Sequence, residues 1–162
     1  MSSRTDWPAW RVISHRAPVV LVLLIAVFLA APSASTASNR TLKITFARWS
    51  HVIAVDAYGI DLSAFRRHPR RMVRRARHFR VDALHARTAI AARRPSTARG
   101  LRGKRLALAA FSYYAAVGRQ WVLSGQARLQ RHTRAAVSHA TLARQLSVKG
   151  NRTLIAAGRA LR

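Results

Sequence analysis

The stretch from Leu106 to Leu123, LALAAFSYYAAVGRQWVL, decides the fold class of this 162-residue chain. Apolar residues cover nearly the whole circumference of the helix it would form, and Arg119 is its only charge. A helix that is apolar all round lies in a protein core or in a membrane. Its longest uncharged part, Leu106 to Gly118, has 13 residues, whereas a membrane span needs about 20. We therefore expect a buried central helix, whose largest core side chains are Phe111, Tyr113, Tyr114 and Trp121.

The segment before this stretch predicts an amphipathic helix. Pro69 suits the first position of a helix, because the proline ring fixes φ and no backbone N–H is needed there. From that point apolar residues recur at helical steps of 4, 3, 4, 3 and 4: Met72, Ala76, Phe79, Ala83, Ala86 and Ile90. Residues 93–105 then combine Arg with Gly and Pro, and we expect them to form a basic, non-helical connection.

Two further regions carry weaker helical patterns. Residues 42–58 predict a helix that ends at Gly59, followed by a short turn that begins at Asp61. The C-terminal region predicts either one long helix or two, of roughly 126–148 and 151–161, separated at Gly150-Asn151. The sequence thus predicts an all-α, antiparallel bundle of four to five helices. Small and apolar residues form the packing stripe of the C-terminal region: Leu129, Ala136, Ala140, Ala143, Ser147, Gly150, Leu154, Ala157 and Leu161.

The first 37 residues have the pattern of a secretory signal peptide. Residues 1–16 carry three arginines, and residues 17–31 form an uninterrupted apolar run. This run matches the length of a signal-peptide h-region and is shorter than a comfortable membrane span. Ser35 and Ala37 place small residues at the −3 and −1 positions of a cut after Ala37. We expect a signal peptide at 1–37 and a secreted basic domain at 38–162; the alternative is an uncut membrane anchor through residues 17–31.

Positive charge is the strongest functional signal. The chain has 30 Lys or Arg against 4 Asp or Glu, a formal net charge of +26. Arginine suits phosphate because its planar fork binds two oxygens at once. We expect anionic polymers or a membrane surface to bind two dense clusters, although a solvated face set by GC-rich coding DNA is the alternative reading. The clusters contain Arg70, Arg71, Arg74, Arg75, Arg77, Arg80, Arg93, Arg94, Arg99, Arg102, Lys104 and Arg105.

Metal binding has one weak candidate, and catalysis has none. The chain lacks cysteine, which excludes disulfides and thiolate zinc sites. No nucleophile elbow, phosphate-binding loop or zinc-protease motif occurs, so we expect no enzyme, no cofactor and no small-molecule substrate. His78, Asp82 and His85 share one helical face and could hold a divalent ion. Arg71 and Arg75 on the same face oppose a cation, and Asp82 could instead pair with Arg75 or His78.

These features predict a secreted, non-enzymatic helical protein that binds phosphate-bearing envelope polymers, anionic lipid or nucleic acid. One alternative is a membrane-active cationic toxin or antimicrobial, suggested by the amphipathic helix from Pro69 to Arg94. The other is a signal-anchored protein whose basic domain contacts nucleic acid.

Overall fold

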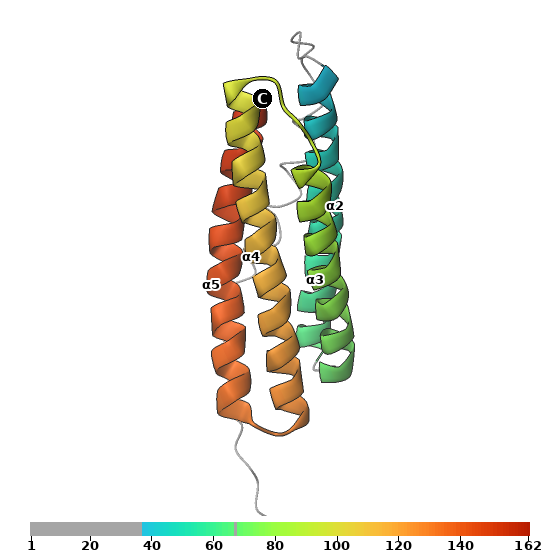
Figure 1. The fold of residues 1–162 in the computed structure, drawn as a ribbon. Coiled ribbons are helices and arrows are strands. Elements are labelled where there is room, and N and C mark those ends of the chain that lie inside the picture. The colour runs from blue at the N-terminus through green and yellow to red at the C-terminus, as the bar shows by residue number, and fades with distance from the viewer. Residues whose placement is uncertain (1–36, 67) are drawn as a thin grey trace, which may run out of the picture.

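The computed structural model describes residues 37–66 and 68–162, which form four packed helices (Figure 1). They are α2 (Ala37–Phe65), α3 (Pro69–Ala91), α4 (Ala98–Leu129) and α5 (Thr133–Leu161). Successive helices run antiparallel, and the described residues contain no strand. The prediction of an all-α bundle is confirmed. None of these four helices is long and apolar enough to cross a membrane. The predicted n-region, apolar run and anchor lie outside the described residues.

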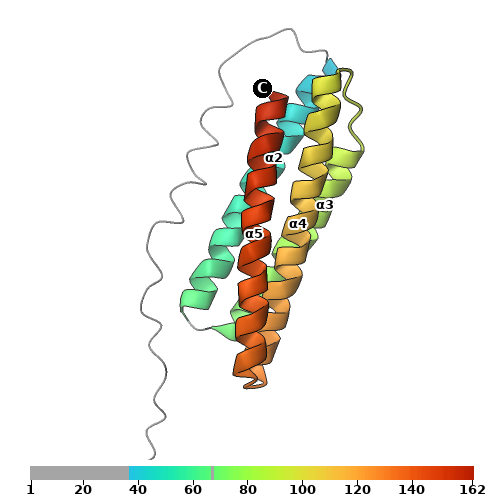
Figure 2. The same cartoon turned by 90° about the vertical axis from the view of Figure 1, so that its left-hand side faces the viewer.

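Helix α4 lies at the centre of the bundle. It packs along α5 and α3 and contacts α2 over a shorter stretch (Figure 2). This position follows from its composition, because a helix without a polar side must be covered by neighbours on several sides. The prediction of a central helix is therefore confirmed. Phe111, Tyr114 and Trp121 are buried as expected, whereas Tyr113 is half-buried.

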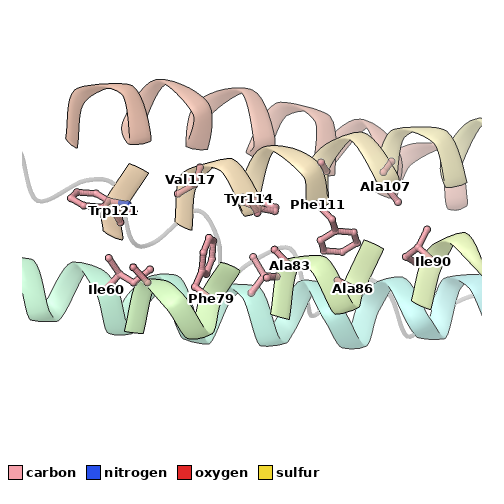
Figure 3. Packing of buried hydrophobic residues seen from close by; sticks show 14 of the residues in the cluster. Ile60, Phe79, Ala83, Ala86, Ile90, Ala107, Phe111, Tyr114, Val117 and Trp121 are labelled. Atoms are coloured by element: carbon pink, nitrogen blue, oxygen red, sulfur yellow. The ribbon is translucent and has the colours of Figure 1, made fainter. Parts of the chain in front are cut away.

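The core between α3 and α4 is formed by two facing helical stripes (Figure 3). All six predicted apolar residues of α3 are buried. Phe79 meets Tyr114 edge to face with ring centroids 6.0 Å apart, and Phe111 meets Phe46 of α2 at 6.3 Å. Edge-to-face geometry places the positive edge of one ring against the negative face of the other. The aromatic residues thus join three helices at the middle of the bundle.

Helix α2 does not end at Gly59, so that prediction was wrong. The helix continues to Phe65, and Asp61 lies within it rather than at the start of a new turn. Gly59 is buried, and a Cβ there would collide with the guanidinium of Arg75 on α3. This glycine leaves room for the Arg75 side chain and does not terminate the helix.

The connection between α3 and α4 is shorter than predicted. Helix α4 begins at Ala98, where the Thr97 hydroxyl accepts a hydrogen bond from the Gly100 N–H at 3.0 Å. This side-chain cap satisfies one of the unpaired donors of the first turn. Gly100 and Gly103 lie buried inside the helix, where a Cβ would collide with Asn39 and Leu161 respectively. Their role is close packing, so the prediction of a non-helical connection over 98–105 was wrong.

The turn between α4 and α5 lies at residues 130–132 and one helix follows it, so of the two alternatives for this region the one with separate helices at 126–148 and 151–161 was wrong. Arg131 adopts a φ of 61°, and the His132 N–H donates to the Ala127 carbonyl at 2.8 Å. The turn therefore uses the left-handed conformation without a glycine. Helix α5 is continuous through Gly150. Its stripe is buried at Ala136, Ala140, Ala143, Gly150, Ala157 and Leu161, half-buried at Ser147 and Leu154, and preceded by an exposed Leu129 at the end of α4.

Candidate functional site

The outer face of α3 carries a row of exposed arginines, which we call the α3 arginine stripe: Arg70, Arg74 and Arg77. These residues follow one another at steps of four and three, so they stand above one another on one side of the helix. The opposite side is buried in the core. The amphipathic pattern of the sequence thus fixes both the buried face and the direction of this stripe.

Three further predicted arginines of α3 flank the stripe on the sides that face neighbouring helices: Arg71, Arg75 and Arg80. Arg75 is half-buried and crosses α2 at Gly59. Arg80 is exposed, but the base of its side chain lies against Gly118 of α4, whose Cβ would approach the Arg80 Cβ to 2.8 Å. Long cationic side chains commonly pack their stems and keep the charged end in water. Both residues therefore contribute to packing as well as to charge.

An open hollow of about 430 Å³ lies where α3 begins. Its lining combines Arg70 and Arg71 with His68, Pro69 and Leu129. His68 occupies the N-cap position without a side-chain hydrogen bond to the helix. The backbone N–H groups of a helical first turn carry partial positive charge, which adds to that of the two arginines.

The second predicted cluster surrounds the connection between α3 and α4, and not all of its members are exposed. The Lys104 ammonium donates to the carbonyls of Ala91 at 2.6 Å and Arg93 at 2.5 Å, and so caps the end of α3. Arg93 is half-buried, and its Nε is buried without a hydrogen-bond partner. We call the four exposed members the turn cluster: Arg94, Arg99, Arg102 and Arg105.

No arginine or lysine in residues 37–66 and 68–162 forms an ion pair with an aspartate side chain. The ion pairs that aspartates make within 4.0 Å in this part of the chain are both with His78. The stripe and the turn cluster begin at opposite ends of α3, a helix about 35 Å long at 1.5 Å per residue. Their charges are thus compensated by water and counter-ions, which a polyanion can displace.

Three side chains that could bind a metal meet between α2 and α3, and we call them the Asp–His cluster: Asp56, His78 and Asp82. The His78 Nδ1 lies 3.2 Å from an Asp82 oxygen and 3.4 Å from an Asp56 oxygen. Both carboxylate side chains are mostly buried, whereas the imidazole is 70% exposed. Burial and, next, the neighbouring Asp82 carboxyl raise the pKa of Asp56, against the opposing effect of His78.

The structure keeps two of the three metal candidates together and separates the third. His78 and Asp82 are in contact, as their i, i+4 spacing predicted. His85 instead lies against Trp49 of α2, with ring centroids 6.4 Å apart. Asp56 is the third member of the cluster in place of His85. The sequence analysis did not predict it, because it lies on another helix. In the antiparallel register that sets Trp49 against His85, Asp56 lies opposite His78. This register comes from the packing of the two helices and is not visible in the sequence near Asp56.

Comparisons with protein families, with curated proteins and with solved structures find no match to this chain. Its function is therefore inferred from its own residues.

Proposed function

We propose that the chain is a non-enzymatic helical protein that binds phosphate-bearing polymers or surfaces through arginine. One observation carries the proposal: the α3 arginine stripe is exposed, and no described carboxylate pairs with it. Three guanidinium groups at helical spacing present a row of donors that suits a chain of phosphates. The turn cluster adds a second group of exposed arginines past the other end of α3.

Adsorption to a surface fits the fold better than insertion into a bilayer. Val81 and Leu84 of α3 are exposed, but the predicted apolar stripe of this helix, with Met72, Phe79 and Ile90, is at most 1% exposed at these three residues. Releasing them would require the bundle to open, at the loss of core burial worth about 1.5–3 kcal/mol per large side chain. The membrane-active alternative thus predicts unfolding on the vesicle, and the adsorption proposal predicts none.

We also propose that the basic domain is exported through the leader at 1–37, where it meets phosphate polymers and anionic lipid of the cell envelope. N-terminal sequencing of the protein from culture medium and from membranes tests this address. A product that starts near Ser38 in the medium supports export. Full-length protein found only in the membrane fraction contradicts it.

The binding experiment measures affinity for duplex DNA, polyphosphate and anionic vesicles over a range of salt concentrations. Phosphate binding releases condensed counter-ions, so log K for duplex DNA falls against log salt by about 0.9 for each phosphate that is neutralised. Replacing the stripe by Arg70→Gln, Arg74→Gln and Arg77→Gln is expected to reduce this slope by about 0.9 for each phosphate that is no longer neutralised.

The matched control removes three exposed arginines from α5 through Arg134→Gln, Arg144→Gln and Arg152→Gln. It lowers net charge equally but leaves α3 intact, so it is expected to change the slope less than the stripe variant does. Equal effects of the two variants would assign binding to overall charge rather than to α3. Salt-independent binding, or no binding to any of the three probes, would overturn the proposal. Dye release from the vesicles would favour the membrane-active alternative.

A further inference from the structure

The Asp–His cluster joins two helices through three groups that are common metal ligands. Asp56 comes from α2, and His78 and Asp82 come from successive turns of α3. One ligand atom from each residue lies within 4.8 Å of the others. Two of the three acids of the 38–162 region are therefore held at one place in a strongly basic chain.

The spacing of these atoms matches a compact coordination shell. Zinc binds imidazole nitrogen and carboxylate oxygen at about 2.0–2.2 Å, so neighbouring ligand atoms of a tetrahedral site lie about 3.3 Å apart. The distances from His78 Nδ1 to the two aspartate oxygens are 3.2 and 3.4 Å. An ion placed at bonding distance from all three atoms thus needs little movement of the helices.

One of these oxygens accepts no hydrogen bond. The Asp56 Oδ2 is buried, and its ion-pair partner among the described residues is the exposed His78 imidazole at 3.4 Å. Burying a carboxylate oxygen without a hydrogen bond is costly. Although arginine is abundant, none of the described arginines lies within ion-pair distance of Asp56 or Asp82. A metal ion within the cluster would add positive charge beside both carboxylates and give the Asp56 Oδ2 a ligand bond.

We propose that Asp56, His78 and Asp82 bind a divalent transition-metal ion of the Zn²⁺ class. The imidazole ligand favours such an ion over Mg²⁺ or Ca²⁺, which prefer shells made of oxygen. The 70% exposure of His78 leaves the cluster open to solvent, so the ion can enter and a fourth position is free for water or an anion. By joining α2 to α3, the ion stabilises the folded state over the unfolded one.

Titration of the full-length chain with Zn²⁺ alone, by calorimetry and by thermal unfolding, tests this site. We expect saturable binding with one ion per chain and a rise in Tm that a chelator reverses. Asp56→Asn, Asp82→Asn and His78→Ala are each expected to weaken binding more than tenfold, since even the loss of an outer-shell partner costs about 10–100-fold. Co²⁺ in place of Zn²⁺ is expected to give the visible absorption of a tetrahedral ion.

His85→Ala is the matched control, because this residue lies one helical turn beyond Asp82 and contacts Trp49 instead of the cluster. It is expected to bind Zn²⁺ as the unaltered chain does. Asp56→Asn and Asp82→Asn change shape little, and circular dichroism establishes that each variant is folded. Binding that persists in both aspartate variants, or that is absent from the unaltered chain, would overturn the proposal. Loss of binding only on removal of other histidines would identify an adventitious ion only.

Discussion

The α4–α5 pair and the α2–α3 pair are held together by different kinds of contact. Along α4–α5 the buried residues of α5 are mostly Ala and Gly, including Ala143 and Gly150, so the two helices pack closely, and hydrogen bonds between neutral groups cross this interface. Along α2–α3 a polar cluster and a crossing guanidinium lie between the helices. Ala and Gly fix the distance between two packed helices, because they have no side chain that can change rotamer. Long side chains can change rotamer and so accommodate a substitution nearby. We therefore expect α4 to tolerate change far less than α2.

Loss of the ring of Phe111 is expected to have the largest effect. This side chain is fully buried on α4 and contacts the rings of Phe46 and Tyr114. Phe111→Ala is expected to lower the free energy of unfolding by about 3–5 kcal/mol, because a cavity forms where α2, α3 and α4 meet. Chemical denaturation measures this loss. Tolerance of the substitution would show that the core is not organised around α4.

A pair of glycine substitutions sharpens the comparison. A Cβ at Gly118 would lie 3.0 Å from the Ala76 carbonyl oxygen, which belongs to the backbone of α3. A Cβ at Gly59 would instead meet the mobile end of Arg75. Gly118→Ala is expected to cost about 1–3 kcal/mol through overpacking. Gly59→Ala, the matched control on α2, is expected to be neutral or to gain up to about 1 kcal/mol from helix propensity. Equal losses in thermal unfolding would mean that α4, at its contact with α3, tolerates change as well as α2 does.

Alkaline pH provides a test confined to the α4–α5 pair. The Tyr114 hydroxyl donates to the Asn151 side-chain oxygen at 2.7 Å, and burial raises the pKa of this phenol. The unfolded chain therefore releases the proton first, so the stability that Tyr114 contributes is full below about pH 10 and is lost as pH rises further. Tyr114→Phe is expected to cost about 1 kcal/mol at pH 7 and to reduce the alkaline decline. Tyr113→Phe is the control, and an unchanged decline in Tyr114→Phe would contradict the assignment.

The smallest effect is expected at Asp56 on α2 in the absence of metal. Because the pKa of Asp56 is raised in the folded chain, its stabilising contribution is lost as pH rises above the unfolded value of about 3.9. Asp56→Asn is therefore expected to increase stability at pH 7 by no more than about 0.5 kcal/mol, and less at pH 3. Thermal unfolding with a chelator present measures the difference. A large destabilisation would mean that the ionised Asp56 is a main link between α2 and α3.

Much of the fold follows from local patterns along the chain. The buried face of α3 was predicted at all six of its apolar positions, since a regular helical spacing leaves one way to cover that face. The central place of α4 followed from an apolar circumference too short to span a membrane. The net charge and the outward direction of the α3 arginine stripe also follow from sequence, because charged side chains stay in water when nothing pairs with them.

Some residues have a role in the folded chain that their local sequence does not indicate, and only the tertiary structure shows it. Gly59 was predicted to end a helix and Gly103 to lie in a non-helical connection, but both lie inside helices, where a neighbouring side chain occupies the space of the missing Cβ. The turn at Arg131 carries no glycine signal at all.

The α3 arginine stripe and the Asp–His cluster differ in the same way: one depends on local sequence and the other on how two helices pack. The α3 arginine stripe needs one helix, so its spacing is visible in the sequence. The Asp–His cluster needs the antiparallel register of α2 on α3. This register brings the Asp56 Oδ2 to 3.4 Å from the Nδ1 of His78, a residue 22 positions further along the chain. That register is set by burial across the whole interface, and the sequence near either residue does not contain it.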